Sequence, residues 1–359
     1  MTLAGALWSH AGDPPPATPA LPEPATAAQE TSGITILPDQ QFSDLALRLD
    51  FKPATAELGS GGQTGDATTD GFDIWSAFNS GMTFAPYHEG PAVDPSPGSI
   101  RAWGQLLAHT GDHAAFYLPY VTQRLVEGGL PPELALLPFV ESAYDPLAQS
   151  PGGAAGLWQF TRATAARLGL KYNPWYDGRK DIVRSTDAAV TYLHHLNRRF
   201  DGDWLLSLAA YNSGEGRVAQ AIEANLSRGR STDFWALDLP PTTRAYVPRF
   251  LALAKLFRDG EAHRYLSVPV NDLPHPLETL ILPEQISLKH AAELAGMDYE
   301  MLKRFNTGLK SEVTPPQGPH RLILPKPAAQ RFLTALAVAE RSARRRDAEE
   351  SDTRQTSAM

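Results

Sequence analysis

The sequence contains no cysteine, which excludes disulfide bonds, thiolate metal sites, a cysteine nucleophile and a lipid anchor on an N-terminal cysteine. It has no apolar run that approaches the roughly 18 residues of a membrane span. The net charge is −8 and no basic patch with interleaved aromatic residues occurs, so we expect no nucleic-acid partner. The H-E-x-x-H, P-loop and nucleophile-elbow motifs are absent too, and we expect neither a metal site nor a cofactor.

The first twenty residues lack the features of a secretory signal, which needs a basic start and a longer apolar core. Arg48 is the first basic residue of the chain. Three explanations stay open: a signal outside this sequence, a different start, or another export route. The absence of cysteine does not fix the compartment, because many periplasmic proteins also lack it.

Composition divides the 359 residues into a tail, a large domain and a small module. Residues 1–70 are rich in Pro, Ala, Thr, Gly and Ser, and they bury too little apolar surface to offset the entropy of ordering. We expect this tail to be mostly disordered, with local docking of the apolar patches at 34–37 and 45–51. The remaining predicted parts are a large domain over 71–258, a linker over 259–275, a small module over 276–326, and a helix with a polar tail over 327–359.

The large domain is predicted to be mainly α, because from about residue 99 the apolar spacing is helical and strand patterns are rare. Pro131 and Pro132 open a new helix, since proline is tolerated in a first turn. Pro138 lies inside the following apolar run and is expected to kink it one turn before Glu141. The expected helices span 73–79, 100–109, 113–127, 161–168, 185–200, 204–211, 215–225 and 243–258.

The small module has the order strand, helix, helix, strand, which defines a βααβ unit. Its apolar pattern changes from extended to helical and back within about 50 residues. The expected strands span 277–282 and 321–324, the expected helices span 288–295 and 299–305, and a final helix spans 328–344.

Glu141 is the candidate catalytic residue, because it ends the strongly apolar run of residues 134–140. Burial in a low dielectric disfavours the charged carboxylate, and the negative end of a helix dipole acts in the same direction. A carboxyl that stays protonated near neutral pH suits a general acid for glycosidic bonds. From this stretch alone, a surface glutamate that caps a core helix is an equally good interpretation.

Five more polar side chains form the candidate substrate-binding set: Ser142, Gln159, Tyr211, Asn212 and Tyr246. Amides suit the N-acetyl and hydroxyl groups of sugars, and an aromatic face such as that of Trp158 stacks on a sugar ring. Each has a structural alternative. Ser142 can bond the helix backbone, Gln159 can cap a turn, and Asn212 can simply end a helix.

Two other polar features favour structural roles. Asp145 is four residues after Glu141, but Pro146 follows it, so its backbone is expected to be extended and to turn away. His194 and His195 are adjacent, so on a helix they point in different directions and do not form a chelating pair.

Three short motifs follow one another in order: Glu-Ser at 141–142, Gly-Leu-Trp-Gln at 156–159 and Ala-Tyr-Asn at 210–212. With this order and spacing, the chain resembles the lytic transglycosylases of bacterial peptidoglycan, of the membrane-bound lytic murein transglycosylase D type. The matching stretches are 130–146, 153–170, 177–193, 202–216 and 246–248. The resemblance covers about half of the chain and continues more faintly into the small module.

The resemblance implies a lysozyme-like, mainly α-helical catalytic domain with an open cleft. Glu141 corresponds to the family's single catalytic acid/base. The remaining positions line the substrate cleft: Ser142, Gln159, Tyr211, Asn212 and Tyr246. The family usually has Glu-Thr where this chain has Thr242-Thr243, which puts in doubt any contact of the missing acid.

The small module resembles a degenerate LysM-like unit, a class that binds N-acetylglucosamine polymers. It lacks the usual Gly-Asp-Thr-Leu opening, so glycan binding and a structural extension of the catalytic domain are both open.

The resemblance further implies an enzyme that cleaves the MurNAc-β-1,4-GlcNAc bond of peptidoglycan without water and leaves 1,6-anhydro-MurNAc ends. The partner is then the glycan strand, and the place of action is the periplasm or cell envelope. We expect a monomer with loose membrane or cell-wall association. Two alternatives stay open: a hydrolase of goose-type-lysozyme character, and a non-catalytic peptidoglycan-binding protein.

Overall fold

The computed structural model describes residues 29–31, 34–37, 74–80, 83–84, 97–266 and 276–357. The chain divides into two compact units. Most of the predicted tail, and part of the predicted linker, lie outside the described residues. The described part of the first unit comprises 74–171 and 178–266, and that of the second comprises 29–37, 172–177 and 276–357, with the gaps given above.

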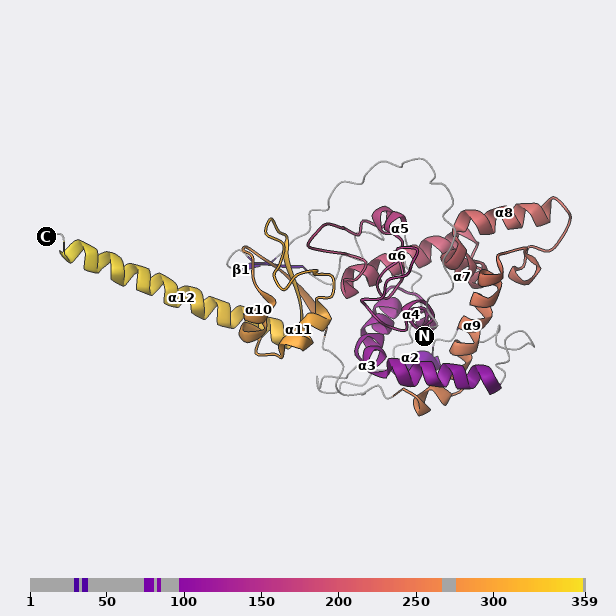
Figure 1. Ribbon diagram of the computed structural model, residues 1–359, viewed down its shortest axis with the longest axis horizontal. Coiled ribbons are helices and arrows are strands. Elements are labelled where there is room, and N and C mark those ends of the chain that lie inside the picture. The colour runs from indigo at the N-terminus through magenta and orange to yellow at the C-terminus, as the bar shows by residue number, and fades with distance from the viewer. Residues whose placement is uncertain are drawn as a thin grey trace, which may run out of the picture. The chain divides into compact units, whose positions relative to one another are not determined.

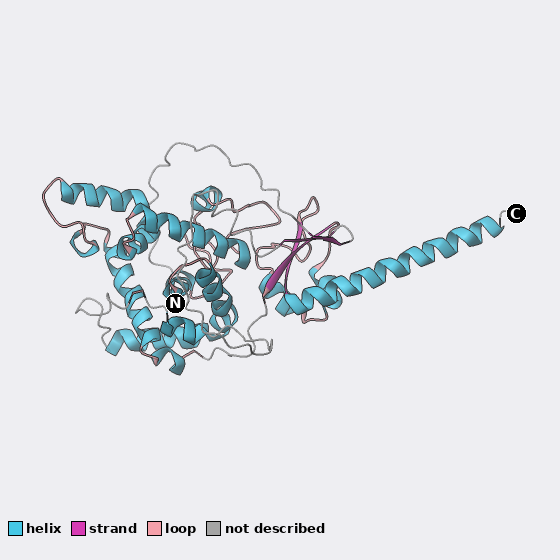
Figure 2. Cartoon of the chain, turned by 180° about the vertical axis from the view of Figure 1, so that it is seen from behind, coloured by secondary structure: helices cyan, strands magenta, loops and turns pink. Residues whose placement is uncertain are grey.

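The first unit is built mainly of helices, as predicted (Figures 1 and 2). Its helices are α2 (Ile74–Ser80), α3 (Pro97–Glu127), η3 (Pro132–Leu136), α4 (Leu137–Ser142), α5 (Arg162–Arg167), α6 (Ile182–Arg199), α7 (Trp204–Ser213), α8 (Glu215–Leu226), η4 (Phe234–Ala236), α9 (Pro241–Arg258) and η5 (Glu261–Arg264).

Side-chain caps fix where three of these helices begin. The side chains of Thr161, Asp181 and Asp203 each accept the backbone N–H three residues later, at the starts of α5, α6 and α7. Such caps contribute about 1 kcal/mol each. Thr161 lies at the start of its helix, as predicted, and is the N-cap that precedes Arg162.

The prediction of two helices over 100–109 and 113–127 is wrong, because α3 is one helix of 31 residues. The two predicted segments are in phase, so one apolar face continues through Gly111. This face includes the buried residues Leu107, Ala114, Leu118 and Val121. An internal glycine costs about 1 kcal/mol, less than burial of this face returns.

A kink at Pro138 is predicted within the apolar run before Glu141. In the structure, this run is divided between a 3₁₀-helix and an α-helix just before Pro138. The 3₁₀-helix η3 ends at Leu136, and α4 begins at Leu137 with Pro138 in its first turn. Proline is tolerated there because the first turn has no intrahelical acceptor for its missing N–H. Helix α4 ends when Ala143 enters the left-handed region at φ 54°. Glu141 therefore lies in the last turn of a short helix.

An aromatic cluster forms part of the core of the first unit. Phe250 and Phe257 of α9 are buried, and they pack with Phe84, Phe78 and Phe139 at ring-centroid distances of 5.3, 5.1 and 5.9 Å. Phe139 lies two residues before Glu141, so the same cluster that anchors α9 also fixes α4. Packing at native density in this way restricts the position of the catalytic candidate.

The second unit contains the predicted βααβ order, which is confirmed: β3 (Leu277–Leu282), α10 (Leu288–Ala295), α11 (Tyr299–Phe305) and β4 (His320–Pro325). Strands β3 and β4 pair antiparallel, with Leu280 opposite Leu322. The long helix α12 (Lys326–Ser357) follows. Its first turns contribute Ala328, Ala329 and Phe332 to the core of the module, so that core extends beyond the boundary predicted at residue 326.

Two strands from the N-terminal tail complete this sheet. β1 (Gln29–Thr31) and β2 (Ile34–Leu37) extend it in the antiparallel order β1-β2-β3-β4. The patch at 34–37, for which we expect local docking, is β2, and Ile36 lies opposite Leu280. Composition does not predict these strands, because β2 needs the distant strand β3 as its hydrogen-bonding partner, and β1 in turn pairs with β2. Among the described helices, none combines the length and the low polarity that crossing a bilayer requires.

Candidate active site

Glu141 has the environment that its sequence position predicts. Its carboxyl oxygen Oε1 accepts a hydrogen bond from the Tyr246 hydroxyl at 2.6 Å. Burial raises the pKa of Glu141 to about 7, although the hydrogen bond from Tyr246 acts in the opposite direction. The carboxyl is therefore largely protonated on the acid side of neutral pH and ionised on the alkaline side.

Two tyrosines accompany this carboxyl. Tyr246 comes from α9, and Tyr211, from the end of α7, donates its hydroxyl to the backbone oxygen of Trp158 at 2.8 Å. Burial and the charge of Glu141 raise the pKa of both phenols well above their usual value. Both hydroxyls therefore stay protonated, and Glu141 lies close enough to interact with each of them.

Glu141 has no carboxylate partner in the part of the chain that the structure describes. Burial and the bond from Tyr246 set its pKa, without a contribution from another acid. Glu133 is also a buried carboxyl whose pKa is raised to about 7, mainly by burial. Its Oε1 accepts the backbone N–H of Phe84 at 3.0 Å, which indicates a structural role.

The loop after α4 is held by two of the predicted site residues. The buried Ser142 hydroxyl lies 2.9 Å from the backbone oxygen of Leu157 and 3.1 Å from that of Pro138. The Gln159 amide donates to the backbone oxygen of Gly156 at 2.8 Å, while Gln159 itself has φ 48°. Both side chains therefore have the structural role that the sequence left open as an alternative to substrate binding. They bond the backbone and shape the loop beside Glu141.

Asn212 links the two helices that carry the tyrosines. Its side-chain oxygen accepts a hydrogen bond from the buried Thr243 hydroxyl at 2.9 Å, which joins the end of α7 to the start of α9. Thr242, where the family usually has an acid, is exposed. The structure thus brings Glu141 and Tyr246 into direct contact, with Tyr211 near them, and places Ser142, Gln159 and Asn212 in the supporting framework.

Sequence reasoning missed Arg179, which supports the same loop. Its guanidinium is buried and donates to the backbone oxygens of Gly153 and Phe160 at 2.6 and 3.4 Å. The backbone oxygen of Arg179 also lies against Gly156, so closely that no side chain fits there. The signal for this role was the position of Arg179 in a matching stretch, but nothing in its spacing points to the loop.

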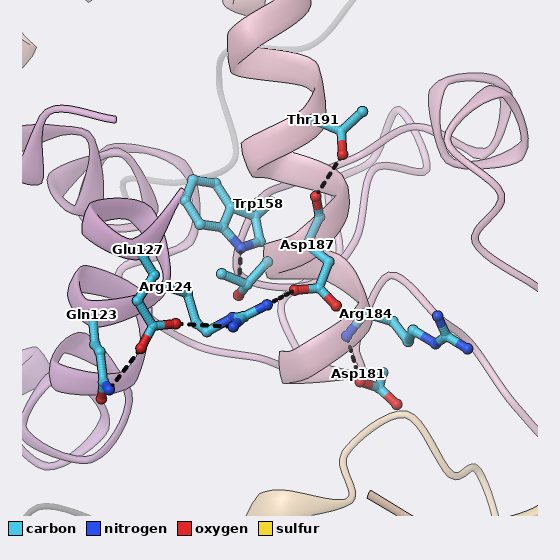
Figure 3. Close-up of polar contacts among 9 residues, drawn as sticks. Gln123, Arg124, Glu127, Trp158, Asp181, Arg184, Asp187 and Thr191 are labelled. Carbon is cyan, nitrogen blue, oxygen red and sulfur yellow. Dashed lines mark hydrogen bonds and ion pairs between the residues drawn. The ribbon is translucent and has the colours of Figure 1, made fainter. Parts of the chain in front are cut away.

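A polar network around the buried Arg124, on α3 and α6, was also missed (Figure 3). Trp158 donates its indole N–H to the Thr186 hydroxyl of α6 at 3.1 Å. On the next residue of α6, Asp187 pairs with the buried Arg124 of α3 at 2.9 Å, and Arg124 also pairs with Glu127 at 2.9 Å. This network fixes Trp158, whose backbone oxygen in turn orients Tyr211.

The two adjacent histidines have separate structural partners. His194 bonds the backbone oxygen of Gly128 at 2.7 Å, whereas His195 bonds Glu215 at 2.5 Å. Burial opposes ionisation of Glu215, but His195 and Arg167 outweigh it and lower the pKa of this carboxyl. No group of three potential metal ligands occurs among the residues described.

Comparisons with known proteins bear directly on this site. Residues 122–234 match the family described as Transglycosylase SLT domain. This region of the chain is therefore similar to the transglycosylase SLT domain. The matched range includes Glu141, Ser142, Gln159, Tyr211 and Asn212, whereas Tyr246 follows it. Residues 276–340 match the LysM-like domain of lytic transglycosylase MltD, in agreement with the resemblance of the small module to a LysM-like unit.

Several curated proteins are similar to the SLT region. Membrane-bound lytic murein transglycosylase D of Escherichia coli is 42% identical over 224 residues, which are 62% of this chain and 49% of that protein. The chain thus spans about half the length of this relative. Membrane-bound lytic murein transglycosylase F of Desulfosudis oleivorans is 35% identical over 37% of this chain and 30% of its own length. The solved 70 kDa soluble lytic transglycosylase from Escherichia coli is 26% identical over 39% of this chain and 24% of that chain, with a TM-score of 0.31.

Proposed function

We propose that this protein is a peptidoglycan lytic transglycosylase in which Glu141 is the single acid/base. The observation that carries the proposal is the carboxyl of Glu141, with a pKa raised to about 7 and a 2.6 Å bond from Tyr246. Glycosidases normally use two carboxylates that flank the bond, and Glu141 has no such partner among the described residues. A route in which one carboxyl acts twice suits this arrangement.

In the proposed reaction, protonated Glu141 donates its proton to the oxygen between MurNAc C1 and GlcNAc C4. The C1–O bond breaks, the GlcNAc 4-hydroxyl leaves, and the 2-acetamido group of MurNAc supports the positive charge at C1. Ionised Glu141 then accepts the proton of the MurNAc 6-hydroxyl, whose oxygen bonds to C1 and closes a 1,6-anhydro ring. Glu141 returns to its protonated state and no water is used.

The remaining site residues have proposed roles around this centre. Tyr246 donates to Glu141 when the carboxyl is ionised, and Tyr211 contributes a hydroxyl and a ring to the same wall. Ser142, Gln159 and Asn212 act as positioning residues, because their hydrogen bonds go to the loop or to Thr243. Direct contacts of these three with substrate remain a prediction.

The proposed place of action is the periplasm or cell envelope, where peptidoglycan strands are the partner. The names of the similar murein transglycosylases support this proposal. A monomer with loose membrane or cell-wall association remains our expectation.

Replacement of Tyr246 by phenylalanine is expected to lower kcat/KM by about 10- to 100-fold. This factor corresponds to the free energy lost with one hydrogen bond to a charged group. Tyr246 lowers the pKa of Glu141, so its loss raises that pKa above the value of about 7. A general acid works in its protonated form, so activity falls as pH rises through this pKa. The alkaline limb of the kcat/KM profile should therefore move to higher pH.

Tyr211→Phe is the matched control for Tyr246→Phe. It also removes one buried tyrosine hydroxyl, but this hydroxyl bonds the backbone of Trp158 rather than Glu141. The alkaline limb should stay in place in this control. An unmoved limb in Tyr246→Phe would show that the hydrogen bond does not tune the catalytic group.

Release of dye from labelled, purified murein tests the proposed function. The full chain is expected to release dye, because it carries the acid, the tyrosines and the framework described above. A chain that binds murein but releases no dye would instead support the alternative of a non-catalytic peptidoglycan-binding protein.

A further inference from the structure

A short hairpin at residues 172–177 belongs to the second unit. Tyr172 pairs with Asp177, and the N–H of Asn173 donates to the backbone oxygen of Tyr176 at 2.9 Å. The Asn173 side chain accepts the N–H groups of Trp175 and Tyr176, each at 2.8 Å. These bonds define a tight turn with Trp175 near its tip.

The hairpin is fixed to the segment that follows α11. The N–H of Lys310 donates to the backbone oxygen of Trp175 at 2.9 Å, and the N–H of Asp177 donates to that of Gly308 at 2.8 Å. The Lys310 ammonium donates to the backbone oxygen of Asn173 at 2.6 Å. Because three bonds hold it at both sides, the turn presents its side chains in a defined position.

The side chains that it presents are aromatic and exposed. Tyr172 is 48% exposed and Trp175 is 38% exposed, although they lie only three residues apart. Single apolar residues on a surface need no explanation, but two large aromatics on one rigid turn favour an interaction site. The Lys310 ammonium lies 3.6 Å from the centroid of the Tyr172 ring, a cation–π contact.

The chemistry of this surface matches a sugar chain that carries acids. Exposed aromatic rings stack on the apolar C–H faces of pyranose rings, and their hydroxyl or indole N–H can hydrogen-bond the ring substituents. Lys310 forms no ion pair with a carboxylate in the described structure, so its charge is available to an anionic group. Peptidoglycan combines N-acetylated pyranoses with lactyl and peptide carboxylates.

We propose that Tyr172, Trp175 and Lys310 form a glycan-docking site, which binds a stretch of peptidoglycan strand without cleaving it. The aromatic pair stacks on the sugars, and Lys310 meets a carboxylate. The choice of peptidoglycan as the ligand rests on the proposed function, whereas the site itself rests on the hairpin. No contact of this site with the reacting bond is required.

Binding of the full chain to glycan tests the proposal. All proteins carry Glu141→Gln so that the ligand stays intact, and the probes are soluble GlcNAc hexamers and pelleted murein sacculi. Trp175→Ala is expected to weaken binding to both probes about tenfold, the equivalent of one lost aromatic contact of about 1.4 kcal/mol. Tyr172→Ala should weaken binding in the same direction. Trp175→Phe should restore most of the affinity, which a general folding defect would not allow.

Trp235→Ala is the matched control, because Trp235 is 50% exposed and belongs to η4 of the first unit. Its affinity for glycan should equal that of the parent chain. Unchanged binding in Trp175→Ala, or an equal loss in Trp235→Ala, would overturn the proposal. Dye release by the chain with Glu141 intact is scored separately, so a failure of catalysis is distinguishable from a failure of docking.

Discussion

Replacement of Glu141 by glutamine is expected to lower murein turnover by about 10²- to 10⁴-fold, the usual contribution of a general acid/base. Glutamine has nearly the same shape and can still accept the hydrogen bond from Tyr246, but it can neither donate an acidic proton nor take one up. Turnover is measured by dye release and by quantification of the muropeptides.

The same substitution is expected to stabilise the protein at alkaline pH. Burial raises the pKa of Glu141 from 4.5, the value of an unperturbed carboxyl, to about 7 in the fold, so the folded state holds the proton more tightly. Stability is therefore lost as pH rises from about 4.5 to 7, and the loss is complete above pH 7. This loss of folding stability is at most about 3 kcal/mol, because one pKa unit corresponds to 1.36 kcal/mol. It is smaller where water reaches the carboxyl. Glu141→Gln should thus raise Tm at pH 8 and leave it nearly unchanged at pH 4.

Glu133→Gln is the matched control for both effects. Glu133 is buried and its pKa is likewise raised to about 7, but it bonds the backbone of Phe84 and has no proposed catalytic role. We expect it to gain stability at pH 8 and to keep turnover within a few-fold of the parent. Substantial residual activity in Glu141→Gln, or an equal loss in Glu133→Gln, would mean that the wrong carboxyl was assigned.

Replacement of Gly156 by alanine is expected to destabilise the first unit by about 4 kcal/mol or more. Gly156 has φ 80°, and a Cβ atom there would approach the backbone oxygen of Arg179 to 1.8 Å. The clash involves two backbone segments, so no side-chain rotation relieves it. At about 2–4 °C per kcal/mol for a domain of this size, Tm should fall by roughly 10 °C.

Gly153→Ala separates the clash from the strain of a left-handed backbone. Gly153 also has φ 80°, but a Cβ atom there meets nothing within 4 Å. It should cost only about 1–2 kcal/mol, the strain of an L-residue in this region. Calorimetry of both variants gives the comparison. Equal losses would contradict the close approach of Arg179 to the loop, because strain alone would then explain both.

Local patterns in the sequence predicted the features that depend on near neighbours. The four elements of the βααβ module, the start of a helix near Thr161 and the apolar run before Glu141 all follow from periodicity and short-range chemistry. The raised pKa of Glu141 was also predicted, because the apolar residues 134–140 that precede Glu141 imply that its carboxyl is buried.

Features that depend on distant partners could not be predicted. The hydroxyl of Ser142 and the amide of Gln159 bond the loop backbone, and their spacing fits a substrate contact equally well. The role of Arg179 appears only when the loop is folded around it. Strand β2 forms because β3, more than 200 residues later, supplies its hydrogen-bonding partner.

Digestion of purified murein in oxygen-18 water, followed by mass spectrometry of the products, tests whether the reaction closes an anhydro ring without water. We expect muropeptides that end in 1,6-anhydro-MurNAc, with a mass lower by one water than that of the reducing form, and with no oxygen-18. Reducing-end muropeptides that carry one oxygen-18 atom would contradict this expectation, because they would require water as the nucleophile in place of the sugar's own 6-hydroxyl.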